Sequence, residues 1–403
     1  MSFFILSSLS AQWIQQSSGV TSNLYDVKFL NEKTGWSLGD GGKVIKTTNA
    51  GVNWFNVPNP AIGKPLSTIH IVDSNVVYFC GYFETIIKTI DGGSNWIIIR
   101  NGPSGFGSSY NAIFFINQNT GWIAGTGQKV LRTTNGGITI DSTSLFWGTL
   151  SDFYFINSST GILCGDGNVF KTINGGISWF ETNIPIKGTF SQFRRIGKFG
   201  NNIWAIGNDA RVFRSTDFCE TWNLIDTIEP SEPNIIGVGF VNQSTGYAGG
   251  NSGKLYKTID GGFSWRRENT GTDLRFVASI CFTNDTTGYV CGGAGKMIYT
   301  EHGGMTNVNF LSSKLPESFE LKQNYPNPFN GQTNIEFSIT KQDYYSFEIY
   351  NLLGQKLETI FSETKSIGKY RVNYNGINLS SGTYFYKLSS GERSIVKSFL
   401  LIK

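Results

Sequence analysis

Short apolar segments recur along the first three quarters of the chain, and each is followed by a segment that begins and ends with glycine. Residues 27–30, 113–116, 153–156 and 238–241 are such apolar segments, and residues 35–39 show the Gly-x-x-x-Gly pattern that follows. Apolar runs of this length, bounded by turn residues, are typical of β-strands. The pattern predicts four short strands in every repeat: an inner strand, a second strand, a third that ends at a threonine, and a fourth that begins near a tryptophan.

A turn motif, Thr-x-(Asp/Asn)-x-Gly-x-x-Trp, sets the period of the repeat. Complete copies occupy residues 47–54 and 89–96, and five further copies follow. The central positions of the copies are Asn49, Asp91, Asn135, Asn174, Asp217, Asp260 and the substituted His302. Successive positions are 39 to 44 residues apart, which is the length of one four-stranded propeller blade. The repeat therefore predicts an all-β fold, a seven-bladed β-propeller over residues 12–310.

We expect the turn motif to be structural. The short Asp or Asn side chain accepts backbone N–H bonds within a tight turn, the Thr hydroxyl adds a bond, and the glycine permits a positive φ. The tryptophan then packs its large apolar area onto the blade. A ring of acids that binds calcium is the alternative. Because each copy contributes one acid from a separate blade, we predict no metal site and no cofactor.

The seventh copy is degenerate, because His302 and Asn307 replace the Asp and the Trp. At the start of the chain, residues 12–16 resemble a fourth strand but lack a turn motif of their own. We predict that Trp13 takes the Trp position of the seventh blade, so that the N-terminal strand closes the ring. Closure of this kind removes exposed strand edges.

The turn motif resembles the Asp-box, or BNR repeat, of sialidases and related propellers. Its longer form, Lys-Thr-x-(Asp/Asn)-Gly-Gly-x-x-Trp with Gly-Trp-x-x-Gly ahead of it, is most similar to the photosystem II assembly factor propellers. The resemblance covers residues 12–310 and implies a propeller fold. Besides the degenerate seventh copy, two copies depart from the pattern, since Ile140 replaces the Trp of the third copy and Cys219 the Gly of the fifth.

A second, smaller domain is predicted after the repeat stops. Residues 311–322 read as a polar linker, and residues 323–403 contain several segments with strand patterns, at 333–339, 345–351, 368–374, 382–388 and 394–402. Alternation of polar and apolar residues within these segments favours half-buried strands. We therefore expect a small Ig-like β-sandwich over residues 323–403.

Motifs in this second domain resemble the type IX secretion sorting domain of the Bacteroidetes group. The residues that carry the resemblance are Pro326, Asn327, Pro328, Phe329, Gly354, Gln355, Gly382 and Tyr384. The resemblance implies export through the inner membrane and periplasm, with an outer-membrane translocon as the partner of this domain. It implies a protein that is secreted or attached to the cell surface. An ordinary accessory sandwich that binds sugar is the alternative.

The N-terminus and the composition agree with export. Residues 1–11 form an apolar run that ends in Leu-Ser-Ala, which predicts the end of a signal peptide whose start lies upstream. The net charge is +4 without a basic run, so there is no case for nucleic acid. No stretch approaches the roughly 20 apolar residues of a membrane span. Five Cys without a CxxC pair favour neither a disulfide framework nor a zinc site.

Propellers bind ligands at the mouth of the central channel, so candidate site residues come from the inner strands. The polar residues expected to face the channel are Asp26, Lys28, His70, Asp152, Tyr154, Gln192 and Arg194. Ion pairs and hydrogen bonds that only stabilise the channel are the alternative. No catalytic residue is assigned, because Asp26 and Asp152 come from distant blades and no GxSxG, HExxH or P-loop occurs.

These observations predict a secreted or cell-surface propeller that acts as a non-catalytic binding or scaffold module. Its expected partner is a surface glycan or an envelope protein. A glycan-active hydrolase of the Asp-box superfamily is the first alternative, and an assembly factor for envelope complexes is the second. A role in photosystem assembly itself is not expected, because the sorting domain points to a cell surface and not to a thylakoid.

Overall fold

A computed structural model describes most of the chain. The described residues are 13–103, 108–127, 129–145, 148–185, 192–229, 232, 234–301, 303, 308–312, 316–376, 379–391 and 393–403. Among them the regular structure is β-strand, apart from two 3-10 turns, η1 (Asp40–Gly42) and η2 (Gly293–Gly295). This confirms the all-β class. A search of the described residues finds no helix that is long and apolar enough to span a membrane. The predicted signal peptide, residues 1–11, lies outside the described residues.

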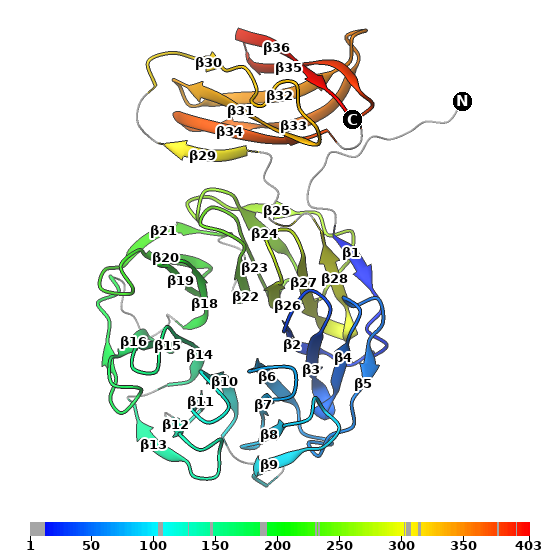
Figure 1. The fold of residues 1–403 in the computed structure, drawn as a ribbon. Helices are drawn as coiled ribbons and strands as arrows, with labels where there is room; N and C mark the ends of the chain where they lie inside the picture. The colour runs from blue at the N-terminus through cyan, green and yellow to red at the C-terminus, as the bar shows by residue number, and fades with distance from the viewer. Residues whose placement is uncertain are drawn as a thin grey trace. The chain divides into compact units, whose positions relative to one another are not determined.

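Seven four-stranded antiparallel sheets, the blades, surround a common axis within the described part of residues 13–301 (Figure 1). Blades 1 to 4 are β2 (Leu24–Phe29), β3 (Gly35–Gly39), β4 (Val44–Thr47) and β5 (Phe55–Asn56); β6 (Leu66–Ile71), β7 (Val77–Gly81), β8 (Ile86–Thr89) and β9 (Ile97–Arg100); β10 (Tyr110–Phe115), β11 (Gly121–Gly125), β12 (Lys129–Thr133) and β13 (Asp141–Ser144); β14 (Leu150–Phe155), β15 (Gly161–Gly165), β16 (Asn168–Thr172) and β17 (Phe180–Glu181). Blades 5 to 7 are β18 (Phe193–Phe199), β19 (Asn202–Gly207), β20 (Arg211–Ser215) and β21 (Asn223–Thr227); β22 (Ile235–Phe240), β23 (Gly246–Gly250), β24 (Leu255–Thr258) and β25 (Arg266–Glu268); β26 (Val277–Phe282), β27 (Gly288–Gly292), β28 (Met297–Thr300) and β1 (Ile14–Gln16).

The N-terminal strand supplies the outer strand of the seventh blade. β1 pairs antiparallel with β28, with Ile14 opposite Tyr299 and Gln16 opposite Met297. Trp13, just before β1, is buried and meets the ring of Tyr247 on blade 6 edge-on, with ring centroids 5.4 Å apart. The two ends of the repeat region are therefore joined by backbone hydrogen bonds, which cover the outer edge of β28 and close the ring.

The turn motif forms the expected hydrogen bonds in the six copies whose central residue is described. In the first copy, Thr47 Oγ1 donates to Asn49 Oδ1 (3.0 Å) and accepts from the N–H of Gly51 (2.9 Å). Asn49 Oδ1 also accepts from the N–H of Asn53 (3.0 Å). Cys219 of the fifth copy keeps the same turn, although its φ of 69° is a conformation that favours glycine. His302 of the seventh copy lies outside the described residues.

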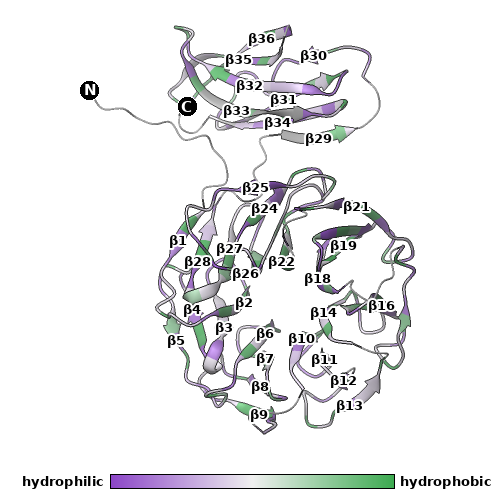
Figure 2. Ribbon diagram, turned by 180° about the vertical axis from the view of Figure 1, so that it is seen from behind, coloured by the Kyte–Doolittle hydropathy of each residue, from purple (hydrophilic) through white to green (hydrophobic). Residues whose placement is uncertain are grey.

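Aromatic stacking joins neighbouring blades. Trp122 on β11 stacks on Phe155 of the next blade with ring centroids 3.6 Å apart, and Trp204 on β19 stacks on Phe240 at 3.5 Å. The tryptophans of the turn motif cover these stacks: Trp179 packs against Phe155 and Trp265 against Phe240. Apolar clusters of this kind lie between neighbouring blades from blade 7 through blades 1 to 6, and hydrophobic residues are distributed around the whole ring (Figure 2).

The C-terminal unit is a sandwich of two four-stranded antiparallel sheets. One sheet has the order β29 (Val308–Ser312), β34 (Gly368–Asn375), β31 (Gln332–Ile339) and β30 (Glu320–Leu321), and the other has the order β33 (Lys356–Lys365), β32 (Asp343–Tyr350), β35 (Gly382–Ser390) and β36 (Arg393–Leu401). Buried aromatic residues such as Phe337, Phe347 and Tyr386 fill the space between the sheets.

Two short strands precede the predicted sandwich, residues 323–403, and the first of them lies partly in the range predicted as propeller. Residues 308–312 were assigned to the end of the propeller and the start of the linker, but they form β29 and pair with β34. Residues 320–321, placed in the linker, form β30 and pair with β31. Contacts group residues 305–403 into one unit and 12–304 into another. The short strands add backbone hydrogen bonds to sheet edges, which a polar sequence does not reveal.

The sorting motif residues connect the start of this unit to its last strand. Asn327 Oδ1 accepts from the N–H of Leu400 (2.9 Å), and Phe329 exchanges backbone hydrogen bonds with Leu400 and Ile402. The Phe329 ring is buried, with its centroid 5.3 Å from that of Phe399. The Tyr384 ring stacks on Phe399 from β35, next to Gly382. Gly354 and Gln355 form the turn before β33, where Gly354 has a φ of 73°.

Candidate functional site

Every inner strand of the ring contains a β-bulge near its start. In blade 1, Leu24 lies opposite Gly39 and Asp26 lies opposite Leu38, so Tyr25 is an extra residue without a partner in the ladder. The same shift occurs in the other six inner strands, and the extra residues are Tyr25, Ser67, Asn111, Ser151, Arg194, Ile236 and Ala278. We call these seven residues the bulge ring. A bulge redirects a side chain, and this ring puts one such side chain on every blade.

The bulge ring lines a cavity of about 330 Å³ at the mouth of the channel. Arg195, Tyr82, Asn234 and Asn251 complete the lining. Tyr25 is held in place because its hydroxyl donates to Asp40 Oδ1 (2.7 Å). The mouth therefore presents guanidinium, amide, hydroxyl and aromatic groups from separate blades to one space.

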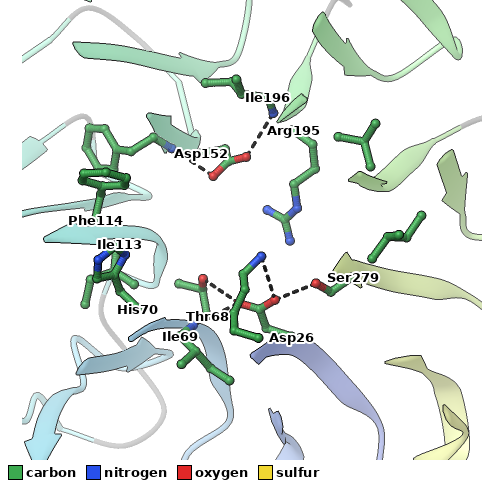
Figure 3. A pocket seen from close by; sticks show the side chains of 14 residues that line it. Asp26, Thr68, Ile69, His70, Ile113, Phe114, Asp152, Arg195, Ile196 and Ser279 are labelled. Carbon is green, nitrogen blue, oxygen red and sulfur yellow. Dashed lines mark hydrogen bonds and ion pairs between the residues drawn. The ribbon is translucent and has the colours of Figure 1, made fainter. Parts of the chain in front are cut away.

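A second cavity of about 230 Å³ lies within the channel, next to the residues that follow the bulges (Figure 3). Its polar lining includes Asp26, Lys28, His70, Asp152 and Arg195. Arg195 also lines the mouth cavity, so its side chain connects the two spaces. Of the seven residues expected to face the channel, Asp26, Lys28, His70 and Asp152 are brought together here.

In blade 5, the structure places Arg195 where blade 1 has Asp26, and not Gln192 or Arg194, which are expected to face the channel. Arg195 lies opposite Ile206 as Asp26 lies opposite Leu38. The connection between β18 and β19 consists of residues 200 and 201, with a positive φ at Gly200, whereas the connection between β2 and β3 consists of residues 30–34. Spacing from neighbouring motifs therefore misplaces this strand.

Gln192 has a different position from the one expected. Its Oε1 accepts hydrogen bonds from the Arg194 guanidinium and from Asn208 Nδ2, the latter at 2.9 Å. It thus orients Arg194 at the channel mouth and does not itself line either cavity. Tyr154 lies beside the inner cavity, where its ring meets Phe114 edge-on and the Lys198 amine sits 4.5 Å from the ring centroid.

Asp26 is a hydrogen-bond acceptor shared by three blades. Ser279 of blade 7 donates to its Oδ1 (2.6 Å), and Thr68 of blade 2 donates its hydroxyl to Oδ2 (3.0 Å). The backbone N–H groups of Val27 and Ile69 also donate to the carboxylate, both at 3.0 Å. Lys28 Nζ lies 3.5 Å from Oδ1. Figure 3 shows the bonds from Ser279 and Thr68.

Asp152 occupies the equivalent position in blade 4 and makes the equivalent backbone bonds. Its carboxylate accepts from the N–H of Phe153 (2.9 Å) and from the N–H of Ile196 in blade 5 (3.0 Å). Burial raises its pKa, although Arg195 and the backbone donors favour the charged form. Among the described residues that line the inner cavity, Asp26 and Asp152 thus each join one blade to the next.

His70 is neutral in the channel. Burial lowers the pKa of its imidazole to about 4, and the positive charge of Lys28 lowers it further, while a hydrogen bond with the Phe115 backbone opposes the shift. Its ring centroid lies 4.8 Å from that of Phe114. A neutral imidazole packed against an aromatic ring contributes shape and stability to the channel.

Sequence reasoning missed the mouth residues because the bulge is invisible in a strand-by-strand pattern. The available signal was the glycine that ends every second strand. A Cβ at Gly39 would lie 1.8 Å from the Asn23 carbonyl oxygen, so the chain just ahead of Leu24 presses against this glycine. A recurrent glycine opposite the start of the inner strand marks the close backbone approach next to the bulge.

Comparison with known proteins supports both parts of the chain. Residues 323–403 match the family described as the secretion system C-terminal sorting domain. This match indicates export by type IX secretion toward the cell surface or the extracellular space, and it implies interaction with that secretion machinery. The resemblance predicted from the sequence motifs is confirmed.

The remaining part is similar to photosystem II stability/assembly factors of the HCF136 kind. The chain is 22% identical over 268 residues to the chloroplastic protein of Oryza sativa subsp. japonica and 24% identical over 243 residues to that of Guillardia theta. These alignments cover 61% and 57% of this chain. They span 59% and 55% of the relatives, so less than two thirds of each relative is matched.

Solved structures with the same fold are also β-propellers. YCF48 bound to a D1 peptide has a TM-score of 0.60 and 17% identity, with 73% of this chain and 98% of that one covered. YCF48 from Cyanidioschyzon merolae has a TM-score of 0.58 and 20% identity, with 72% and 99% covered. The WD40 propeller domain of Doa1 gives 0.57 and 12%, with 72% and 97% covered. The chain is therefore a β-propeller followed by a secretion sorting domain.

Proposed function

We propose that the protein is a non-catalytic binding module that works on the cell surface or outside the cell, with the channel mouth as its ligand site. The observation that carries this proposal is the difference between the polar groups of the two cavities. Asp26 and Asp152, the channel acids that a hydrolase would need, are engaged by backbone N–H groups of two blades each. The mouth cavity instead gathers polar side chains from blades 1 to 6, and blade 7 adds Ala278.

The comparisons are compatible with this proposal. The match to assembly factors supports a module that binds, and the sorting domain supports a location where surface glycans and envelope proteins are the available partners. One specific observation favours a second candidate, an assembly factor for envelope complexes. A solved propeller of the same fold is bound to a peptide, which supports a protein segment as the ligand of this candidate.

The proposal is tested with the full chain on arrays of surface glycans and of peptides, together with a panel of glycan hydrolysis assays. We expect binding without turnover, and we expect the Arg194→Gln variant to lose binding. Arg211→Gln is the matched control, because Arg211 carries the same charge in the same blade but pairs with Asp209 and lines neither cavity. Robust hydrolysis that the Asp152→Asn variant abolishes would overturn the proposal in favour of an enzyme.

A further inference from the structure

We infer that the mouth cavity binds the terminal acidic sugar of a glycan, a pyranose that carries a carboxylate. This inference rests on the proposed function and names the ligand class of the same site. Five features of the bulge ring and its neighbours support it: two arginines without a carboxylate partner, two buried hydroxyls without a hydrogen-bond partner, the amide groups, the aromatic rings, and the interrupted inner strands.

The first observation concerns the two arginines. Among the described residues, no carboxylate oxygen lies within 4.0 Å of the guanidinium of Arg194 or of Arg195. Arg195 Nη1 has only long contacts, at 3.4 Å, with the carbonyls of Ser151 and Arg194. Guanidinium groups that keep unused donors and line one cavity are suited to a planar carboxylate, which a guanidinium binds through paired hydrogen bonds.

The second observation is a buried hydroxyl without a partner. Ser151 belongs to the bulge ring and is 3% exposed, yet its Oγ has no hydrogen-bond partner. Ser67, in the same ring, also has a buried Oγ without a partner. Buried polar atoms are normally hydrogen-bonded, so two free hydroxyls that line one cavity indicate groups supplied by a ligand.

The remaining lining suits a polyol. Asn111, Asn234 and Asn251 supply amides, which pair with hydroxyl groups as both donor and acceptor. Tyr25 and Tyr82 add aromatic rings, and Tyr82 is 42% exposed. A pyranose ring has hydroxyls at its edge and C–H groups on its faces, so it uses amides and aromatic rings together. The carboxylate on the same ring would engage Arg194 and Arg195.

The backbone disfavours an extended peptide at this position. Peptides that bind to a sheet edge require a regular ladder of free N–H and C=O groups. Each inner strand is interrupted by its bulge at the mouth, and the seven bulges come from separate blades. The mouth is therefore lined by side chains of separate blades and not by a continuous strand edge, which suits the end of a chain that enters along the axis.

The experiment measures binding of three probes to the full chain by calorimetry: the methyl glycoside of galacturonic acid, the methyl glycoside of galactose, and an acetylated tripeptide with a free carboxylate. We expect the acid sugar to bind at least tenfold more tightly than the neutral sugar and the peptide. Arg194→Gln should remove this preference, and Arg211→Gln should keep it. Ser151→Ala should weaken acid-sugar binding severalfold without lowering the melting temperature, because its hydroxyl has no partner in the protein.

Equal affinity for the acid and neutral sugars would overturn the inference, as would acid-sugar binding that survives Arg194→Gln. If only the peptide binds, and Arg194→Gln abolishes that binding, the acid-sugar assignment fails while the proposed binding function stands. If none of the probes binds, the assignment also fails. In that case the arrays described above decide separately whether the mouth binds another ligand.

Discussion

Replacing Asp26 by alanine tests whether the channel acids serve the fold. The carboxylate accepts hydrogen bonds from the backbone N–H groups of Val27 and Ile69 and from the hydroxyls of Thr68 and Ser279. Asp26 is 2% exposed, so the two N–H groups have no replacement acceptor once the carboxylate is removed. The hydroxyls can turn toward the inner cavity. The change therefore breaks the connection among blades 7, 1 and 2.

The magnitude follows from the number of donors left without partners. A buried donor without an acceptor costs about 1–3 kcal/mol, so two N–H groups cost about 4 kcal/mol. For a domain of this size, that loss lowers the melting temperature by about 10 °C. Thr68→Val removes a single hydroxyl bond and should cost about 1 kcal/mol. Asp152→Ala should cost less than Asp26→Ala, because Asp152 also accepts from two backbone N–H groups but its burial already disfavours the charged carboxylate.

Urea denaturation of the full chain, followed by tryptophan fluorescence, measures these differences. The expected order of stability loss is Asp26→Ala, then Asp152→Ala, then Thr68→Val. A loss below 1 kcal/mol for Asp26→Ala, or a loss no larger than that of Thr68→Val, would refute the view that this acid joins three blades. Such a result would indicate that Asp26 serves ligand binding or catalysis and not the stability of the ring.

Three further predictions concern stability. His70 has a folded-state pKa of about 4, below its ordinary 6.5, so it takes up its proton preferentially in the unfolded chain. Stability is therefore lost as the pH falls below 6.5, by about 2 kcal/mol between pH 7 and pH 5, and denaturation of His70→Gln at the two pH values should show that this part of the loss is gone. Deletion of residues 12–18 removes β1 and should lower the melting temperature by many degrees, whereas an unchanged melt would exclude ring closure by this strand. Backbone and side-chain bonds from Asn95 lower the pKa of Asp91 to about 2, so its stabilising effect is present above its ordinary pKa and is lost as the pH falls toward 2. In Asp91→Asn, the free energy of unfolding should fall less steeply as the pH is lowered from about 4 to about 2. A pH dependence identical to that of the wild type would contradict the role of the carboxylate.

The repeat made the ring predictable from sequence. The turn motif recurs once per blade, and its bonds are local, so Thr47 and Asn49 form their turn without help from distant residues. The sequence also predicts the outer strand of the seventh blade, because the seventh turn motif is degenerate while residues 12–16 resemble a fourth strand that has no turn motif of its own. Local, repeated chemistry of this kind can be predicted well from a single sequence.

The site was harder to predict because it depends on register. One bulge shifts every later residue of a strand to the other face, and the shorter connection at Gly200 moved Arg195 into the place expected for another residue. Arg194 was expected in the channel but lies in the mouth, where Gln192 orients it. The edge strand β29 was missed for a similar reason, since its partner β34 lies more than 50 residues later.

The account is tested most directly by the location of the bound ligand on the ring. This location is measured by amide hydrogen exchange of the full chain, with and without a saturating concentration of the glycan or peptide that binds on the arrays. We predict slower exchange at the starts of the inner strands, around Tyr25, Asn111 and Arg194, and unchanged exchange in outer strands such as β5 and β9. Protection confined to the outer strands or to the sorting domain would contradict the assignment of the channel mouth as the ligand site.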